Sequence, residues 1–289
     1  MGGATAVRPN WIALARAGVG LLSVLLLLFG LNEARLQRAE STYLSDVAAT
    51  IRTGQASADI EAAVSYTYRN AYLGRGRRGP LRASALETLD PRIGGQCGEF
   101  SRLAINVLSA MGYPARRVYL FPSPAAAGAF NPRVQRSYHV MGEVWIDGRW
   151  VAVDPLRGIT FRHPDGRFVT LAELATTPAP IDLAYKSRPV ETHRTVRGRV
   201  IERPLDVSMA YYRHPEWINW SRIARVPFAF RVLWPWLGHR DRVHVPLVLE
   251  QPHRLRAIVA LAAGLALGLA CLVRGRPRAL RSAGKPGVA

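Results

Sequence analysis

The sequence predicts a mixed α+β domain that lies between two membrane-spanning helices. Two apolar stretches, residues 11–31 and 257–273, lie near the ends of the 289-residue chain, and each is long enough to cross a bilayer. Between them, periodicity predicts an amphipathic helix after residue 96 and a β-hairpin over residues 137–155. The chain is 49% hydrophobic and can bury one good-sized domain, which these signals place in its middle.

The two apolar stretches predict a two-pass protein of the cell membrane. The first contains Arg16, which must extend to an interface, and the second has no charge. A cleaved signal peptide is the alternative for the first, but no clear small-x-small site follows Leu31. A buried core helix is the alternative for the second, but arginines flank it on both sides. The arginines after Val273 predict cytoplasmic termini and an extracytoplasmic position for residues 32–256.

Small residues give both spans a surface suited to close packing. Gly264 and Gly268 form a Gly-x-x-x-Gly pattern in the second span, and Gly18 and Gly20 lie in the first. Such surfaces let helices approach closely. The two spans could therefore pack together, or the chain could form a homodimer through them.

Cys97 stands where a glycine-rich loop runs into the predicted amphipathic helix. Apolar residues with i, i+3, i+4 spacing follow it: Phe100, Leu103, Ala104, Val107, Leu108 and Met111. Gly112 ends the helix, which places Cys97 in the first turn and on the buried stripe. Free backbone N–H groups and the helix dipole favour a thiolate there. The alternative is that Cys97 is a small buried hydrophobic residue.

The hairpin brings a histidine and an aspartate together. Asp147-Gly148 is a strong two-residue turn signal, which pairs Ile146 with Arg149 and, further along, Met141 with Asp154. His139 and Asp154 then share one face as diagonal neighbours, with Cβ atoms about 7 Å apart. A carboxylate at that distance can hold an imidazole ring.

Cys97, His139 and Asp154 together predict nucleophilic catalysis. A thiolate attacks an acyl carbon, His139 moves the proton, and Asp154 fixes the ring and stabilises the imidazolium. Taken singly, His139 could be a packing histidine and Asp154 a turn-forming residue before a proline. The sequence does not dock the cysteine helix on the hairpin.

These residues resemble the bacterial transglutaminase-like domain. The resemblance rests on Gly-x-Cys at a helix start, on Gly112-Tyr113-Pro114-Ala115-Arg116, and on His-x-x-x-Glu-Val-Trp…Gly-x-Trp…Asp-Pro. It covers residues 57–182 and is strongest from 94 to 157. It implies a papain-like α+β core, with the nucleophile helix packed on an antiparallel sheet that carries His139 and Asp154. The family includes proteases, transamidases, deamidases and members without known activity, so the fold does not choose the reaction.

Gln96 is the candidate oxyanion donor, by likeness to a glutamine near the cysteine in the wider papain group. The backbone N–H of Cys97 could serve equally, because amides at a helix start point at developing negative charge. The alternative for Gln96 is an exposed loop amide. No Asp/Glu-rich loop suggests calcium and no Cys/His cluster has metal-ligand spacing, so we expect no metal and no organic cofactor.

Charge and cysteine content limit the partners. The net charge of +19 comes from dispersed arginines, with no recognition motif, so we expect no nucleic acid and instead contact with membrane lipid. Cys97 and Cys271 are the only cysteines, and Cys271 lies in a predicted span, so the domain has no internal disulfide. The expected substrate is a peptide or protein amide. A non-catalytic scaffold that binds a peptide or polymer is the competing class.

The organisation along the chain follows from these signals. We expect an N-terminal tail (1–10), a transmembrane helix (11–31), a juxtamembrane helix or linker (32–56), a catalytic domain (57–182), an accessory region (183–256), a second transmembrane helix (257–273) and a basic tail (274–289). The accessory region holds Trp217, Trp220, Trp234 and Trp236 among arginines, which suits a membrane interface or a small lobe packed on the domain.

Overall fold

The computed structural model describes residues 11–75, 84–121, 139–176, 182–183, 190–204, 214–216 and 251–275. Both predicted tails lie largely outside these residues, and the tryptophan-rich segment 217–236 lies wholly outside them. The chain divides into two compact units, Met1–Arg38 with His253–Ala289 and Ala39–Pro252.

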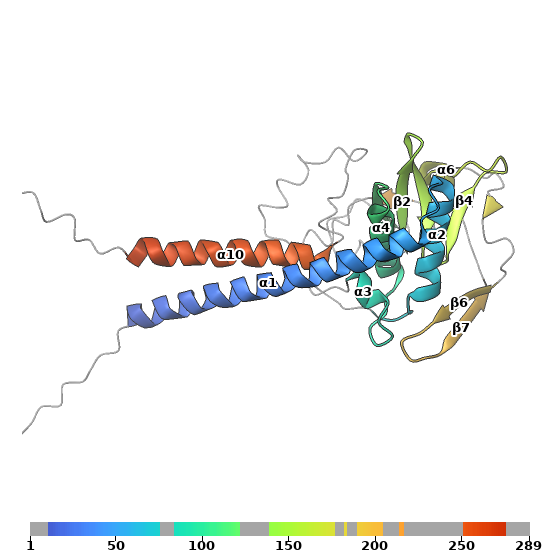
Figure 1. Ribbon diagram of the computed structural model, residues 1–289. Helices are drawn as coiled ribbons and strands as arrows, with labels where there is room; N and C mark the ends of the chain where they lie inside the picture. The colour runs from blue at the N-terminus through green and yellow to red at the C-terminus, as the bar shows by residue number, and fades with distance from the viewer. Residues whose placement is uncertain are drawn as a thin grey trace, which may run out of the picture. The chain divides into compact units, whose positions relative to one another are not determined.

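The first unit pairs two long apolar helices. Helix α1 (Trp11–Ile51) continues without a break past its apolar part, as predicted for the juxtamembrane segment, and helix α10 (Pro252–Gly275) runs beside its first part (Figure 1). Both are long and apolar enough to cross a membrane. Ser23 Oγ donates to Gly264 O at 2.6 Å, and a Cβ on Gly264 would lie 2.9 Å from Leu27 Cγ. The predicted contact between the spans is therefore confirmed at Gly264, while the homodimer stays a prediction.

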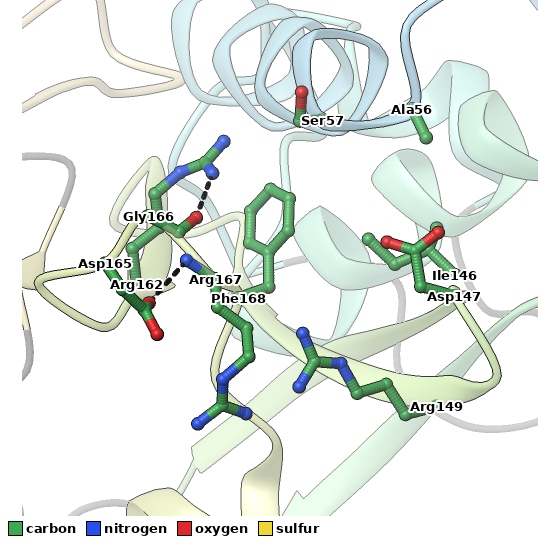
Figure 2. Close-up of a pocket in the computed structure, with 10 residues that line it drawn as sticks. All are labelled: Ala56, Ser57, Ile146, Asp147, Arg149, Arg162, Asp165, Gly166, Arg167 and Phe168. Atoms are coloured by element: carbon green, nitrogen blue, oxygen red, sulfur yellow. Dashed lines mark hydrogen bonds between the residues drawn. The ribbon is translucent and has the colours of Figure 1, made fainter.

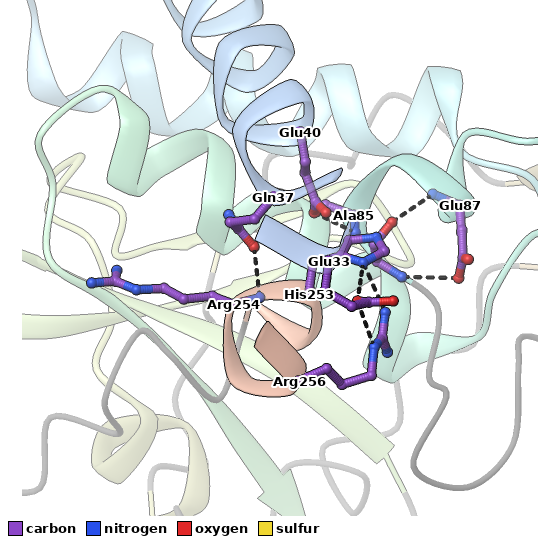
Figure 3. Close-up of polar contacts among 9 residues, drawn as sticks. Glu33, Gln37, Glu40, Ala85, Glu87, His253, Arg254 and Arg256 are labelled. Atoms are coloured by element: carbon purple, nitrogen blue, oxygen red, sulfur yellow. Dashed lines mark hydrogen bonds and ion pairs between the residues drawn. The ribbon is translucent and has the colours of Figure 1, made fainter. Parts of the chain in front are cut away.

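Polar side chains join α1 and α10 where their apolar parts end (Figure 3). Glu33 Oε2 accepts a hydrogen bond from Arg256 Nε at 2.8 Å and lies 2.7 Å from His253 Nδ1. One turn further along α1, Gln37 Oε1 accepts from the backbone N–H of Arg254 at 3.1 Å. Because Glu33 and His253 are both buried, these contacts fix the register of one helix against the other.

The second unit is built around a six-stranded antiparallel sheet with strand order β5-β4-β3-β2-β1-β8. Its strands are β1 (Ala115–Leu120), β2 (His139–Ile146), β3 (Arg149–Asp154), β4 (Ile159–Arg162), β5 (Asp182–Leu183) and β8 (Pro215–Glu216). Helices α2 (Ala56–Asn70), α3 (Ala85–Thr88), α4 (Cys97–Ala110) and α6 (Leu171–Thr176) belong to the same unit (Figure 1). The α+β class predicted from the sequence is confirmed.

Helix α4 packs on the sheet through a continuous core. Buried side chains of α2, α4 and one sheet face form it, among them Ile60, Val64, Phe100, Leu103, Val107, Val144, Val151 and Val153. A second buried cluster, which includes Val118, Met141 and Phe161, covers the opposite face beneath α6. The last turns of α1 add Leu44 and Ala48 to the first core, and Glu40 Oε1 accepts from the backbone N–H of Ala85 at 2.7 Å (Figure 3). The sheet is therefore fixed on both faces.

The hairpin of β2 and β3 has the register that Asp147-Gly148 predicts. Pairs run from Ile146↔Arg149 to Gly142↔Val153. Asp147 and Gly148 both have positive φ, 48° and 75°, which is the geometry of a type I′ turn. The predicted register is confirmed, and it brings His139 and Asp154 to the same end of the hairpin.

Part of the predicted accessory region lies in this unit. Strands β6 (Val190–Arg194) and β7 (Val200–Pro204) form a separate two-stranded sheet. Its turn contacts the chain before α4, since Leu73 makes parallel bridges with both Thr195 and Gly95. The loop that leads into Cys97 is therefore supported by residues about a hundred positions further along the chain.

Candidate active site

Cys97 is the first residue of α4, at the position predicted. The preceding loop is held by backbone hydrogen bonds, because Gly74 N donates to Gly95 O at 2.8 Å and Gly95 N to Tyr72 O at 2.9 Å. Gly94 has φ +57°, and a Cβ on Gly95 would overlap the Cβ of Glu99. Position 94 requires a positive φ and position 95 has no room for a Cβ, and only glycine meets these requirements without strain. The glycines before Cys97 thus set the direction in which the chain enters the helix.

His139 and Asp154 form a buried hydrogen-bonded pair. Nε2 of His139 lies 2.8 Å from Oδ2 of Asp154, and their side chains are 5% and 0% exposed. A carboxylate only accepts, so Nε2 carries the proton in this arrangement. Nδ1 is then the ring nitrogen that faces away from the carboxylate. The contact expected from the strand register is present.

Helix α4 brings Cys97 to this pair. The Cys97 side chain lies close enough to the ring of His139 to raise the pKa of that ring. One helical turn after the cysteine, Ser101 Oγ donates to the carbonyl oxygen of Val140, next to His139, at 3.0 Å. Ser101 and Cys97 lie on the same side of α4 because they are four residues apart. The sequence could not dock this helix, and Ser101 is the residue that it did not single out.

The pair is polarised in the direction that thiol chemistry needs. Burial alone would lower the pKa of the His139 ring, but the charge and hydrogen bond of Asp154, together with Cys97, raise it to about 9. Burial alone would raise the pKa of the Asp154 carboxyl, but His139 and Arg157 hold it well below its usual range. An imidazolium is therefore favoured beside Cys97 at neutral pH.

Arg157 is part of this cluster and was not found by sequence reasoning. It lies in the turn after β3, where its Nη1 donates to Asp154 Oδ2 at 3.0 Å and lies 3.2 Å from His139 Nε2. Its backbone N–H donates to Asp154 Oδ1 at 3.3 Å. The sequence signal that could have found Arg157 is its position three residues after Asp154, in a turn that Gly158 completes with φ +66°.

The oxyanion donor stays open between Gln96 and a backbone amide. Gln96 is exposed, and its backbone N–H donates to Glu99 Oε2 at 3.1 Å. Within the described part of the chain, the N–H groups of Cys97 and Gly98 have no hydrogen-bond partner. First-turn amides of a helix are free in this way. The arrangement supports the N–H of Cys97, while a role for the Gln96 side chain stays a prediction.

Other residues of the recognised motif form a buried structural cluster. Arg116 and Glu143 are opposite each other in β1 and β2, with Nε and Oε2 2.8 Å apart and side chains 4% and 3% exposed. The guanidinium of Arg116 also lies 3.9 Å from the ring centroid of Trp150. The motif thus contains fold residues next to the candidate chemical residues.

A pocket of about 540 Å³ lies away from the cysteine, at the turn end of the β2–β3 hairpin (Figure 2). Arg149, Arg162 and Arg167 line it, but Arg162 contacts Glu61 and Arg167 contacts Glu173. None of Cys97, His139, Asp154 and Arg157 borders it. Among the described residues there is also no cluster of His, Cys, Asp or Glu that could hold a metal ion.

Comparison with known proteins agrees with the fold. Residues 45–155 match the family model of the transglutaminase-like superfamily, and the match includes Cys97, His139 and Asp154. This region is a transglutaminase-like domain. A crystal structure from Cytophaga hutchinsonii, described as a "putative cysteine protease", is 22% identical, with a TM-score of 0.31. The alignment covers 58% of this chain and 53% of that one, about half of its length. No curated protein matches the chain. The assignment of the transglutaminase-like domain rests on the family model.

Proposed function

We propose that the transglutaminase-like domain is a thiol enzyme that acts on amide bonds of peptides or proteins, with Cys97, His139 and Asp154 as its catalytic residues. The observation that carries the proposal is the position of the His139 ring, whose Nε2 lies 2.8 Å from the buried Asp154 carboxylate and whose pKa is also raised by the neighbouring Cys97. A packing histidine does not need a buried carboxylate on one side and a thiol on the other.

The reaction follows from these contacts. The Cys97 thiolate attacks the amide carbon and forms a carbon–sulfur bond, while the N–H of Cys97 stabilises the oxyanion. The His139 imidazolium gives its proton to the amide nitrogen as the carbon–nitrogen bond breaks, which leaves a thioester. Water or an amine then attacks the thioester, His139 accepts its proton, and the thiolate departs. Hydrolysis gives a protease or deamidase, and an amine acceptor gives a transamidase.

Alkylation of Cys97 at different pH values tests this proposal without a known substrate. In the parent chain, iodoacetamide should label Cys97 rapidly well below pH 8, because the imidazolium favours the thiolate. His139→Ala should lose this rapid labelling and behave as an ordinary thiol, which ionises near pH 8.5. The variant Cys97→Ala keeps only Cys271, so any label that it takes up measures the reaction of Cys271. If the parent and His139→Ala label alike, the competing function, a non-catalytic scaffold, is favoured.

We further propose that α1 and α10 anchor the domain in the cell membrane, with the domain outside the cytoplasm and both termini inside. The apolar length of the two helices supports the anchoring, and the arginines after Val273 support the orientation. External protease should then digest the domain in cells whose outer barriers are opened but whose inner membrane is intact. Digestion only after that membrane is permeabilised would reverse the orientation.

A further inference from the structure

Arg157 touches both members of the buried His139–Asp154 pair. Its Nη1 donates to Asp154 Oδ2 at 3.0 Å. The same carboxylate oxygen accepts the hydrogen bond from His139 Nε2 at 2.8 Å. Its backbone N–H reaches the other oxygen at 3.3 Å, so one residue holds both oxygens of the carboxylate. The Arg157 side chain is only 12% exposed, which shields these contacts from water.

In a pair made of His139 and Asp154 alone, the buried carboxylate would lose its positive partner whenever the ring became neutral. When the ring releases its proton, the carboxylate would be left as a single negative charge with no exposed side-chain surface. Such a charge is costly to bury unless it has a partner. Arg157 provides a positive charge that does not depend on the ring, because a guanidinium stays protonated.

The position of Arg157 also acts on the ring. Since Nε2 of His139 donates to Asp154, the 3.2 Å approach of Arg157 Nη1 to Nε2 is a contact between two groups that both carry protons. The positive charge of the guanidinium disfavours the imidazolium and so helps Nδ1 of the ring to release its proton. Charged or titratable groups near the ring in the described residues include Asp154 of β3, Cys97 of α4 and Arg157. Arg117 of β1 donates to the Gly98 carbonyl, and Tyr119 of β1 belongs to the cluster that packs on Cys97.

We propose that Arg157 is a positioning residue, which holds the Asp154 carboxylate against Nε2 of His139 in both protonation states of the ring. The inference rests on the proposed thiol chemistry. Arg157 acts through Asp154 and His139, and it needs no contact with a substrate. The residue therefore sets the pH range in which the Cys97–His139 pair is charged.

The test compares Arg157→Met with the parent, using the full chain in detergent. The rate of labelling by iodoacetamide reports the thiolate, and the ratio of iodoacetate to iodoacetamide rates reports the charge on the ring. Removing a nearby positive charge makes both Cys97 and His139 hold their protons more tightly. Both the acid and the alkaline limb of the pH profile should therefore move to higher pH, by about one pH unit.

Matched variants separate this role from a structural one. Arg157→Gln keeps a hydrogen-bond donor without charge and should give the same shift, which also covers a failure of Arg157→Met to fold. Arg157→Lys restores the charge and should return both limbs toward the parent. Arg92→Met removes an exposed arginine that pairs with Asp90 at 2.7 Å and should change neither limb.

The pH profiles distinguish a failure of this inference from a failure of the proposed function. A slower rate with unchanged limbs in Arg157→Met and Arg157→Gln would assign Arg157 to the stability of the turn and overturn the inference, while leaving the proposed function intact. A parent chain whose Cys97 titrates as an ordinary thiol would overturn the proposed function and this inference with it. Upward movement of both limbs, reversed by Arg157→Lys, supports the inference.

Discussion

Asp154→Asn is expected to slow alkylation of Cys97 at pH 6 by about 10²-fold. The substitution keeps the shape of the side chain but removes the charge that holds the His139 ring as an imidazolium. Without the imidazolium, the thiol behaves as an ordinary one with a pKa near 8.5, of which about 0.3% is ionised at pH 6. The lower intrinsic reactivity of a stabilised thiolate reduces the full ratio of about 300 toward 10².

The measurement is the second-order rate of iodoacetamide labelling at Cys97, by mass spectrometry, for parent and variant from pH 5 to 10. Asp165→Asn is the matched control, because Asp165 is exposed and, among the described residues, its carboxylate accepts a hydrogen bond only from the backbone N–H of Arg167. The two variants should label at the same rate above pH 9, where an ordinary thiol is ionised. Parent-like labelling of Asp154→Asn at pH 6 would mean that the carboxylate does not support the charge of the ring.

Local signals made half of this site predictable. The Asp147-Gly148 turn fixes which residues of β2 and β3 are paired, and pairing decides that His139 and Asp154 share a face. The apolar spacing after Cys97 likewise fixes the start of α4, and the pattern of Thr170 and Glu173 forms a capping box before α6. These features depend on neighbours within a few residues, which a sequence displays directly.

The other half depends on contacts between distant segments. The hydrogen bond from Ser101 to Val140 docks α4 on the sheet, and no periodicity in either element encodes it. Arg157 reaches back to Asp154 only because the turn at Gly158 folds in one particular way. The β6–β7 hairpin, beyond the region of family likeness, supports the loop before Cys97 through Leu73. A single sequence contains the residues for such contacts but not the distances between them.

The motif that led to the family also mixes two kinds of residue, which the structure separates. His139 and Asp154 point to a chemical site, whereas Glu143 and Arg116 form an ion pair on the same sheet, with both side chains at most 4% exposed. A sequence pattern gives both kinds equal weight. Stability and reactivity, measured on the same variants, distinguish them.

Glu143→Ala is accordingly expected to lower the free energy of unfolding by about 3–5 kcal/mol, since it removes the charge that faces Arg116 in a buried position. Denaturant unfolding of the full chain in detergent measures this change. Glu61→Ala is the matched control: it breaks the more exposed pair with Arg162 and should cost less than about 1 kcal/mol. The double variant Arg116→Met/Glu143→Leu should recover most of the loss, because it removes both buried charges of this pair.

The reactivity of Cys97 distinguishes the role of Glu143 from that of Asp154. In conditions where the Glu143→Ala chain is folded, Cys97 should still label rapidly below pH 8, since the contacts of His139 with Asp154 and Cys97 do not include Glu143. Asp154→Asn should show the reverse pattern, with slow labelling in a folded chain. A Glu143→Ala chain as stable as the parent would contradict the cost assigned to a buried arginine that has lost its carboxylate partner. A folded Glu143→Ala chain with slow labelling would instead place Glu143 among the residues that organise the site.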